Sequence, residues 1–320
     1  MTMREAPRVW THGSAVGKAT PASPERAGTR LPVAYVGTYP PRRCGIATFT
    51  RDLSGSGGVQ GVGAQPMIVA VTDPDGRHEY PAEVKYEIRQ GTKSDYARAA
   101  EFISYSDVRM VSIQHEYGIY GGDDGAYILD LVSVLRVPAI ATLHTVLEKP
   151  SGSQKAIIQK LSRACSRLVV MSRVAAGLLQ TSYGIDANRV VRIPHGIPEM
   201  APRDQEGLKA KFGVSDRRML VTFGLLGPSK GIETVIRALP AVVAKYPDVV
   251  YFVVGATHPM VVRQQGEAYR TFLEREAERL GVRRHVVFRD QFVPDQELYD
   301  YLQAADLYVS PYPNEAQVTS

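Results

Sequence analysis

Short apolar runs that alternate with amphipathic stretches constrain the fold of this chain more than any other feature of its sequence. The alternation begins at Leu31, and the runs are rich in Val and Ile. Strands that are apolar on both faces and separated by helices are typical of a parallel sheet covered on both sides. The pattern therefore predicts a doubly wound α/β domain. Strands are expected at residues 31–36, 67–71, 84–88, 108–114, 139–143, 168–171 and 190–193, and helices at 94–105, 127–135, 154–164 and 172–183.

The same alternation restarts after residues 198–204, a segment with two prolines that is typical of a linker. A length of 320 residues also fits two domains at about 150 residues each. We therefore assign 31–200 to a first Rossmann-like domain and 201–320 to a second one. Strands are expected there at 219–223, 249–255, 286–288 and 307–310, and helices at 232–245, 267–280 and 295–304.

The second domain looks incomplete in the sequence. The chain stops ten residues after the last expected strand, and no helix follows to cover that strand. A parallel sheet normally buries both faces, so we expect this strand to expose apolar surface and the chain to be truncated at its C-terminus.

Composition excludes several classes of protein. With 44% hydrophobic and 22% charged residues, the chain resembles soluble globular proteins, and no apolar run approaches the ~20 residues of a membrane helix. Cys44 and Cys165 cannot form a disulfide framework, which favours a reducing, cytoplasmic compartment. The net charge of +5 is spread along the chain, so we expect no nucleic-acid partner. Residues 1–30 lack an apolar signal core, and we expect a disordered basic tail there.

Polar side chains gather where the expected strands end, which is where ligands bind in open parallel sheets. Lys230 and Gly231 directly precede an expected helix, whose free N–H groups and positive dipole end suit a phosphate. In this interpretation Gly231 lets an anion approach the backbone, and Lys230 adds a full charge. The other strand-end candidates are Arg42, Arg43, Gly45, Glu116, His144, His195 and Glu315.

Each candidate also has a plainer explanation. Lys230 could be a solvated turn residue, Glu315 an exposed surface carboxylate, and each histidine a half-buried group bonded to a carbonyl. The carboxylate groups at 73–75 and 123–124 could hold a divalent ion, but Asp-Pro and Asp-Gly pairs favour turns. We therefore expect no metal and no other cofactor.

Taken in order, these motifs resemble those of the retaining glycosyltransferases of family 4, which have the GT-B fold of two Rossmann-like domains facing a cleft. The resemblance runs from about Leu31 to the final residue. Its motifs are the Gly45 loop, Leu143-His144-Thr145, Ile193-Pro194-His195-Gly196, the loop from Gly224 to Lys230-Gly231, and Ser310 to Asn314-Glu315.

The resemblance implies a nucleotide-sugar donor held mainly by the second domain. Lys230 and Gly231 would bind the donor diphosphate, which the Gly45 loop would approach from the first domain. Glu315 would match the first glutamate of the family's E-x7-E motif and contact the hydroxyls of the donor sugar. In the family, the fixed cation and the helix start stabilise the leaving diphosphate, and the departing phosphate takes the proton of the acceptor.

The resemblance also implies a sugar or lipid acceptor held mainly by the first domain. His144 would lie beside the sugar at the reaction centre, and Glu116 and His195 would line the cleft. Arg42 or Arg43 would replace a cation that the family usually has at Leu225. Contact of the two arginines and the basic tail with an anionic membrane surface, at the inner face of the membrane, stays open.

Two further departures from the family concern length. The first helix is expected to be short because glycine and serine interrupt it at residues 54–58. The chain also ends before the second glutamate of E-x7-E could occur.

Three hypotheses follow. The first is a metal-independent retaining hexosyltransferase. The second is an inactive or fragmentary module that binds nucleotide sugars. The third makes Asp73 and Asp75 a metal site in a different transferase fold. The residues do not identify the sugar, the base or the acceptor.

Overall fold

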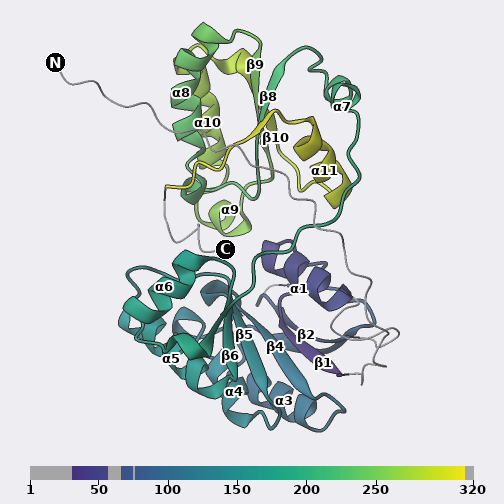
Figure 1. Ribbon diagram of the computed structural model, residues 1–320, viewed down its shortest axis with the longest axis vertical. Helices are drawn as coiled ribbons and strands as arrows, with labels where there is room; N and C mark the ends of the chain where they lie inside the picture. Colours follow the sequence, from purple (N-terminus) through teal and green to yellow (C-terminus); the bar gives the residue numbers. More distant parts are fainter. Residues whose placement is uncertain (1–30, 57–65, 75, 314–320) are drawn as a thin grey trace, which may run out of the picture.

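The first domain is built on a parallel sheet. The computed structural model describes residues 31–56, 66–74 and 76–313, which form two α/β units one above the other (Figure 1). In the first unit the strand order is β3-β2-β1-β4-β5-β6-β7. Strands β2 and β3 therefore lie on one side of β1, and β4 to β7 lie on the other, so the order of the strands reverses between β1 and β4. The strands are β1 (Val33–Gly37), β2 (Met67–Thr72), β3 (Val84–Arg89), β4 (Met110–His115), β5 (Ala139–Leu143), β6 (Arg167–Val170) and β7 (Val190–Arg192).

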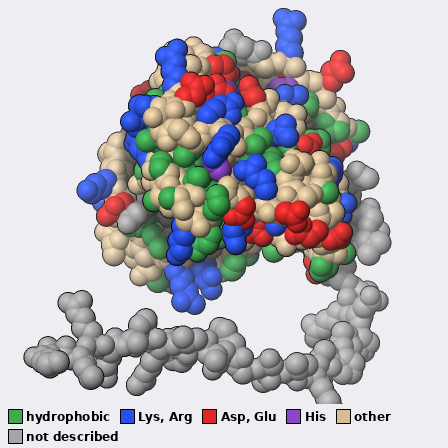
Figure 2. Space-filling view, turned by 90° about the horizontal axis from the view of Figure 1, so that it is seen from above, with side chains coloured by type: hydrophobic (Ala, Val, Ile, Leu, Met, Phe, Trp, Pro, Cys, Tyr) green, Lys and Arg blue, Asp and Glu red, His purple; other side chains and the backbone are tan. Residues whose placement is uncertain are grey.

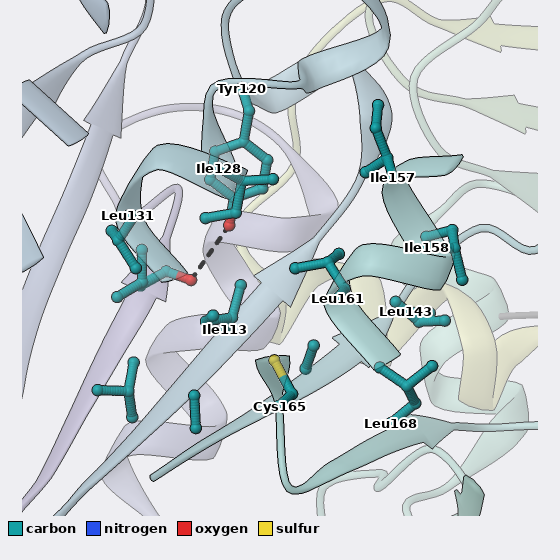
Figure 3. Close-up of a cluster of buried hydrophobic side chains, with 14 of the residues drawn as sticks. Ile113, Tyr120, Ile128, Leu131, Leu143, Ile157, Ile158, Leu161, Cys165 and Leu168 are labelled. Atoms are coloured by element: carbon teal, nitrogen blue, oxygen red, sulfur yellow. Dashed lines mark hydrogen bonds between the residues drawn. The ribbon is translucent and has the colours of Figure 1, made fainter. Parts of the chain in front are cut away.

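One face of this sheet carries the main core. Alternate strand residues such as Ile113, Leu143 and Leu168 pack there against apolar side chains of the helices (Figure 3). Local chemistry supports the helix starts, because Ser151 forms a capping box with Gln154 at the start of α5. The helices of this domain are α1 (Gly45–Gly55), α3 (Lys93–Ser104), α4 (Ile128–Val134), α5 (Gly152–Ala164) and α6 (Arg173–Thr181).

The opposite face of the same sheet was predicted to be covered by helices, but part of it borders a cleft. On this face Leu53 of α1 packs against Val33 and Tyr35. Farther along, Ile140 and Met171 border a cleft between the two domains. The short helix α1 was predicted, and the structure shows that it ends at Gly55.

Strand β3 corrects another expectation. It was predicted to be apolar on both faces, but it lies at the sheet edge, where Lys85, Glu87 and Arg89 point to solvent and Ile88 is buried. An edge strand that is covered on one face alternates apolar and polar residues, which explains the observed pattern.

The second domain has a smaller parallel sheet in the order β10-β9-β8-β11. Its strands are β8 (Arg218–Phe223), β9 (Val249–Val254), β10 (Val286–Arg289) and β11 (Leu307–Tyr308). Helices α8 and α10 pack on one face, and α7 and α11 pack on the other. The helices are α7 (Gln205–Lys211), α8 (Ile232–Lys245), α9 (Pro259–Gln265), α10 (Ala268–Arg279) and α11 (Asp295–Ala304), preceded in the β8–α8 loop by the 3-10 turn η4 (Pro228–Lys230).

The last described strand lies at the open edge of this sheet. Leu307 and Tyr308 of β11 are 57% and 42% exposed, which confirms the expected apolar surface at this strand. The strand is tied at its start, because Asp306 accepts a hydrogen bond from the Met219 amide at 2.6 Å. After β11, Val309 donates its amide to the Val221 carbonyl at 2.8 Å.

The length of the helices and the distribution of surface charge were both considered in the sequence predictions. No helix in the described part of the chain combines the length and the apolar character that crossing a bilayer requires. Basic and acidic side chains are interspersed over the face shown in Figure 2, in line with the even charge distribution of the sequence.

Candidate functional site

A cleft of about 2260 Å³ is lined by residues of both domains. Its walls include the loops that follow β1 and β8. In each sheet the strand order reverses beside one of these strands, between β1 and β4 and between β8 and β11. Two contacts bridge the domains beside it. Arg51 of α1 donates to Asp295 of α11 at 2.8 Å, and the Arg43 guanidinium lies 5.9 Å from the centre of the Phe292 ring.

Lys230 faces this cleft from the second domain, as predicted from the strand-end rule. It is half-buried at the end of η4. Its Nζ donates to the hydroxyl of Tyr312 at 3.2 Å and lies 4.3 Å from the centre of that ring. Within the described residues, no carboxylate lies at salt-bridge distance from Lys230.

The structure explains why residue 231 is a glycine, and this explanation differs from the one predicted from the sequence. Its φ is +64°, in the left-handed region, and a Cβ at this position would lie 2.2 Å from the carbonyl oxygen of Pro311. Glycine is therefore required by the contact between the β8 and β11 loops. Gly231 is not among the cleft-lining residues, and the predicted close approach of an anion to this glycine stays a prediction.

The loop after β1 brings two arginines and Gly45 to the opposite wall. Arg42 is bound by Asp73, with Nη2 2.8 Å from Oδ1, so this carboxylate, one of the two in the metal hypothesis, already has a cationic partner. Asp75 lies outside the described residues. Cys44 caps α1 by accepting from the Ala47 amide. A Cβ at Gly45 would meet no atom within 4 Å, so packing does not require glycine there.

His144 is buried, with 7% of its surface exposed, and it does not line the cleft. Its Nε2 lies 3.1 Å from Oε1 of Gln114. Phe49 of α1 contacts it edge-on at 4.7 Å between ring centres, and the same ring contacts the exposed His195 at 5.2 Å. Because Phe49 and His195 do line the cleft, one aromatic ring separates His144 from it.

Burial keeps two histidines at the carboxyl ends of β4 and β5 neutral. Desolvation, and then the nearby His195, lower the pKa of His144 to about 4. Desolvation, and then His144, lower the pKa of His115 to about 3. Both ring nitrogens of His115 lack a hydrogen-bond partner among the residues that the structure describes.

Glu116 and Thr145 form a polar pair at the ends of β4 and β5. The carboxylate accepts from the Tyr117 amide at 2.9 Å and from the Thr145 hydroxyl at 2.5 Å. Burial raises the pKa of Glu116, and these two hydrogen bonds oppose that effect. Glu116 lines the cleft, as predicted, and so presents a carboxylate to it.

Sequence reasoning missed Phe49, His258 and Tyr312, which all line the cleft. His258 follows β9, so the strand-end rule could have found it. Its pKa is lowered by burial first and then by Lys230 and Arg42, which shows that cations of both domains lie near it. Phe49 is a half-buried residue of α1, and its sequence context gives no sign of a role at the cleft. Glu315 lies outside the described residues, so its predicted role stays a prediction.

Two family models match the chain in succession. Residues 60–199 match the model described as Glycosyltransferase Family 4, and residues 204–316 match the one described as Glycosyl transferases group 1. A curated relative, the GDP-mannose-dependent alpha-(1-6)-phosphatidylinositol monomannoside mannosyltransferase of Mycolicibacterium smegmatis, is 30% identical over 161 residues. That match covers 50% of this chain and 37% of the relative, so the matched region spans little more than a third of the relative's length.

Solved structures share the arrangement of both domains. Anabaena HepE in complex with UDP superposes with a TM-score of 0.66 at 16% identity, covering 88% of this chain and 74% of that one. Sucrose-phosphate synthase from Thermosynechococcus elongatus gives 0.63 at 15% identity, with 88% and 76% covered. WaaG, a glycosyltransferase involved in lipopolysaccharide biosynthesis, gives 0.60 at 19%, with 89% and 76% covered. At these identities the likeness concerns the fold, and the predicted GT-B architecture is confirmed.

Proposed function

We propose that this chain is a glycosyltransferase of the family 4 type, which transfers a sugar from a nucleotide-sugar donor to an acceptor hydroxyl, with retention of configuration and without a metal ion. The observation that carries the proposal is the ammonium of Lys230. It faces the cleft at the reversal point of the second sheet, and no carboxylate among the described residues neutralises it. Ligands of open parallel sheets bind at such points.

The chemistry of the donor explains why such a cation matters. Breaking the bond between the anomeric carbon and the phosphate leaves negative charge on the diphosphate and positive character on the sugar. Lys230 and the start of α8 would stabilise the leaving diphosphate in a site that is partly shielded from water. The acceptor hydroxyl forms the new bond to the anomeric carbon from the leaving-group side, and its proton passes to the departing phosphate.

The first domain would hold the acceptor. Glu116 presents a half-buried carboxylate to the cleft, and His195 adds an exposed ring nitrogen to the same wall. A carboxylate accepts hydrogen bonds from hydroxyl groups, so the wall suits a sugar or another polyol, free or attached to a lipid. We place His144 beside the donor sugar only when Phe49 moves from its present position.

The nucleotide base can be settled by binding. The mycobacterial relative is named as GDP-mannose-dependent, whereas HepE is seen with UDP. A thermal-shift screen of the chain against GDP, UDP and their sugars should raise the melting temperature for one base series, because a ligand that binds only the folded state stabilises it. Binding without product in a parallel turnover assay would favour the alternative of a binding module.

Lys230→Ala tests the proposal itself. Removing one preorganised group that stabilises developing charge should cut turnover by about 100-fold or more. Lys245→Ala is the matched control, since Lys245 also lies near an aromatic ring, that of Tyr246, but is exposed and outside the cleft. Wild-type turnover in Lys230→Ala would contradict the proposal, and loss of activity in a strong chelator would contradict its metal-independent form.

A further inference from the structure

The loops after β8 and β11 are packed against each other through their backbones. The missing Cβ of Gly231 leaves room for the Pro311 carbonyl, and the ring of Pro313 lies 3.1 Å from the same position. The Thr222 hydroxyl also donates to the Val309 carbonyl at 2.6 Å, just before this loop. The residues that flank Gly231 and Pro311 in sequence are therefore held at a set separation by main-chain packing.

Lys230 and Tyr312 are those flanking residues, and they meet through two contacts. The ammonium donates to the phenolic oxygen at 3.2 Å and lies 4.3 Å from the centre of the ring. The second distance is within the range of a favourable cation–π contact, which extends to about 6 Å. Both side chains are half-buried and both line the cleft.

The partner of Lys230 differs in kind from those of two nearby arginines. Arg42 is held by the carboxylate of Asp73, and Arg51 is held by two carboxylates. A carboxylate restrains a cation and also cancels its charge. A tyrosine restrains the flexible lysine side chain, which otherwise loses about 2 kcal/mol of rotamer entropy on binding a ligand, and it leaves the charge intact.

We propose that Tyr312 is a positioning residue for the ammonium of Lys230, which it holds in the cleft in a charged and ordered state, ready for the diphosphate of the donor. The inference rests on the proposed function, because it assigns to Lys230 a diphosphate ligand. It adds a residue and a physical role: Tyr312 orders the cation before the ligand arrives, so that less side-chain entropy is lost on binding.

A double-mutant cycle in the full chain tests this role. Affinities for GDP and UDP are measured by calorimetry for Tyr312→Leu, which removes ring and hydroxyl, and for Tyr312→Phe, which keeps the ring. Each substitution is made beside Lys230 and beside Lys230→Ala. We expect Tyr312→Leu to weaken binding of the preferred diphosphate about fivefold to tenfold when Lys230 is present, and less than about twofold when it is absent.

Two controls separate positioning from a general structural effect. Tyr246→Leu alters an exposed tyrosine outside the cleft whose ring also lies near a lysine, Lys245, and it should leave affinity unchanged. Guanosine and uridine, which lack the diphosphate, should bind the Tyr312 variants as they bind the wild type. Tyr312→Phe should give a smaller loss than Tyr312→Leu, and it keeps the test valid should Tyr312→Leu unfold.

The outcomes distinguish this inference from the proposed function. Equal losses for Tyr312→Leu with and without Lys230, or no loss in either background, would overturn the positioning role and leave the proposed function in place. A wild-type chain that binds neither GDP nor UDP would overturn both.

Discussion

Two glycines occupy the same topological place in the two domains, and they serve different purposes. Gly45 follows β1 at the start of α1, and Gly231 follows β8 at the start of α8. A Cβ would find open space at Gly45, whereas at Gly231 it would meet the Pro311 carbonyl at 2.2 Å. At Gly231 the second loop is thus closed by the backbone of the β11 loop, while Lys230 lines the cleft. The first loop is open to the cleft, and its glycine is not explained by packing.

Gly231→Ala should have the largest effect on stability. It combines a left-handed φ of +64° with a backbone clash, and together these should cost about 2–4 kcal/mol of unfolding free energy, measured by urea denaturation. Gly184 has a similar φ of +67°, but a Cβ there would meet no atom within 4 Å. Gly184→Ala should therefore lose only the free energy of the left-handed backbone conformation, about 1 kcal/mol. Gly45→Ala should cost nothing. Equal losses for Gly231→Ala and Gly45→Ala would erase the contrast between the loops.

The pH dependence of stability should be the next largest effect, and it belongs to the first domain. The pKa of His144 is about 4 in the folded chain against an ordinary value of 6.5, so the unfolded state binds more protons between these values. Stability from this group is complete above pH 6.5 and is lost as the pH falls toward 4. The expected loss is about 2 kcal/mol between pH 7 and pH 5.

Urea denaturation of His144→Asn at pH 7 and pH 5 checks this expectation. The difference between the two pH values should shrink by about 2 kcal/mol relative to the wild type. Glu116, whose pKa is raised by burial, acts in the opposite direction, and the comparison of variants cancels its contribution. An unchanged pH dependence in His144→Asn would contradict a buried neutral imidazole.

The ion pair that joins the two domains should have the smallest effect. Arg51 and Asp295 are 40% and 45% exposed at their side chains, and solvent-exposed pairs contribute about 0–1 kcal/mol. Asp295→Asn should therefore lower the melting temperature slightly at low salt. At about 0.5 M salt, where the screening length is only on the order of a few ångströms, it should not lower the melting temperature. A loss above about 2 kcal/mol, or one that salt does not reduce, would show that this pair does far more than an exposed contact.

Long, strongly patterned elements were predictable from the sequence. Strand β5 and helices α8 and α11 lie where the pattern placed them. Helix α9 was missed because it begins at a proline and is short, and α7 was missed because its seven residues give too little periodicity. The edge strand β3 was misjudged although its strict alternation of apolar and charged residues, VKYEIR, already indicates a strand covered on one face.

The candidate site was predictable in part. The strand-end rule found Lys230, Glu116 and His195, which all line the cleft. The rule could not show that Phe49 separates His144 from the cleft, because that contact joins a helix to a strand end that lies far away in the sequence. Nor could it show that Asp73 binds Arg42.

The sequence by itself determined the order of strands and helices, and with it the two parallel sheets, because buried strands and amphipathic helices carry their pattern locally. It also placed the Lys230 ammonium at a strand end. Only the tertiary structure decided which partner each charged group meets. Tyr312 meets Lys230 because β8 and β11 pair side by side although 82 residues separate the two side chains, and a contact of that range leaves no local trace in the sequence.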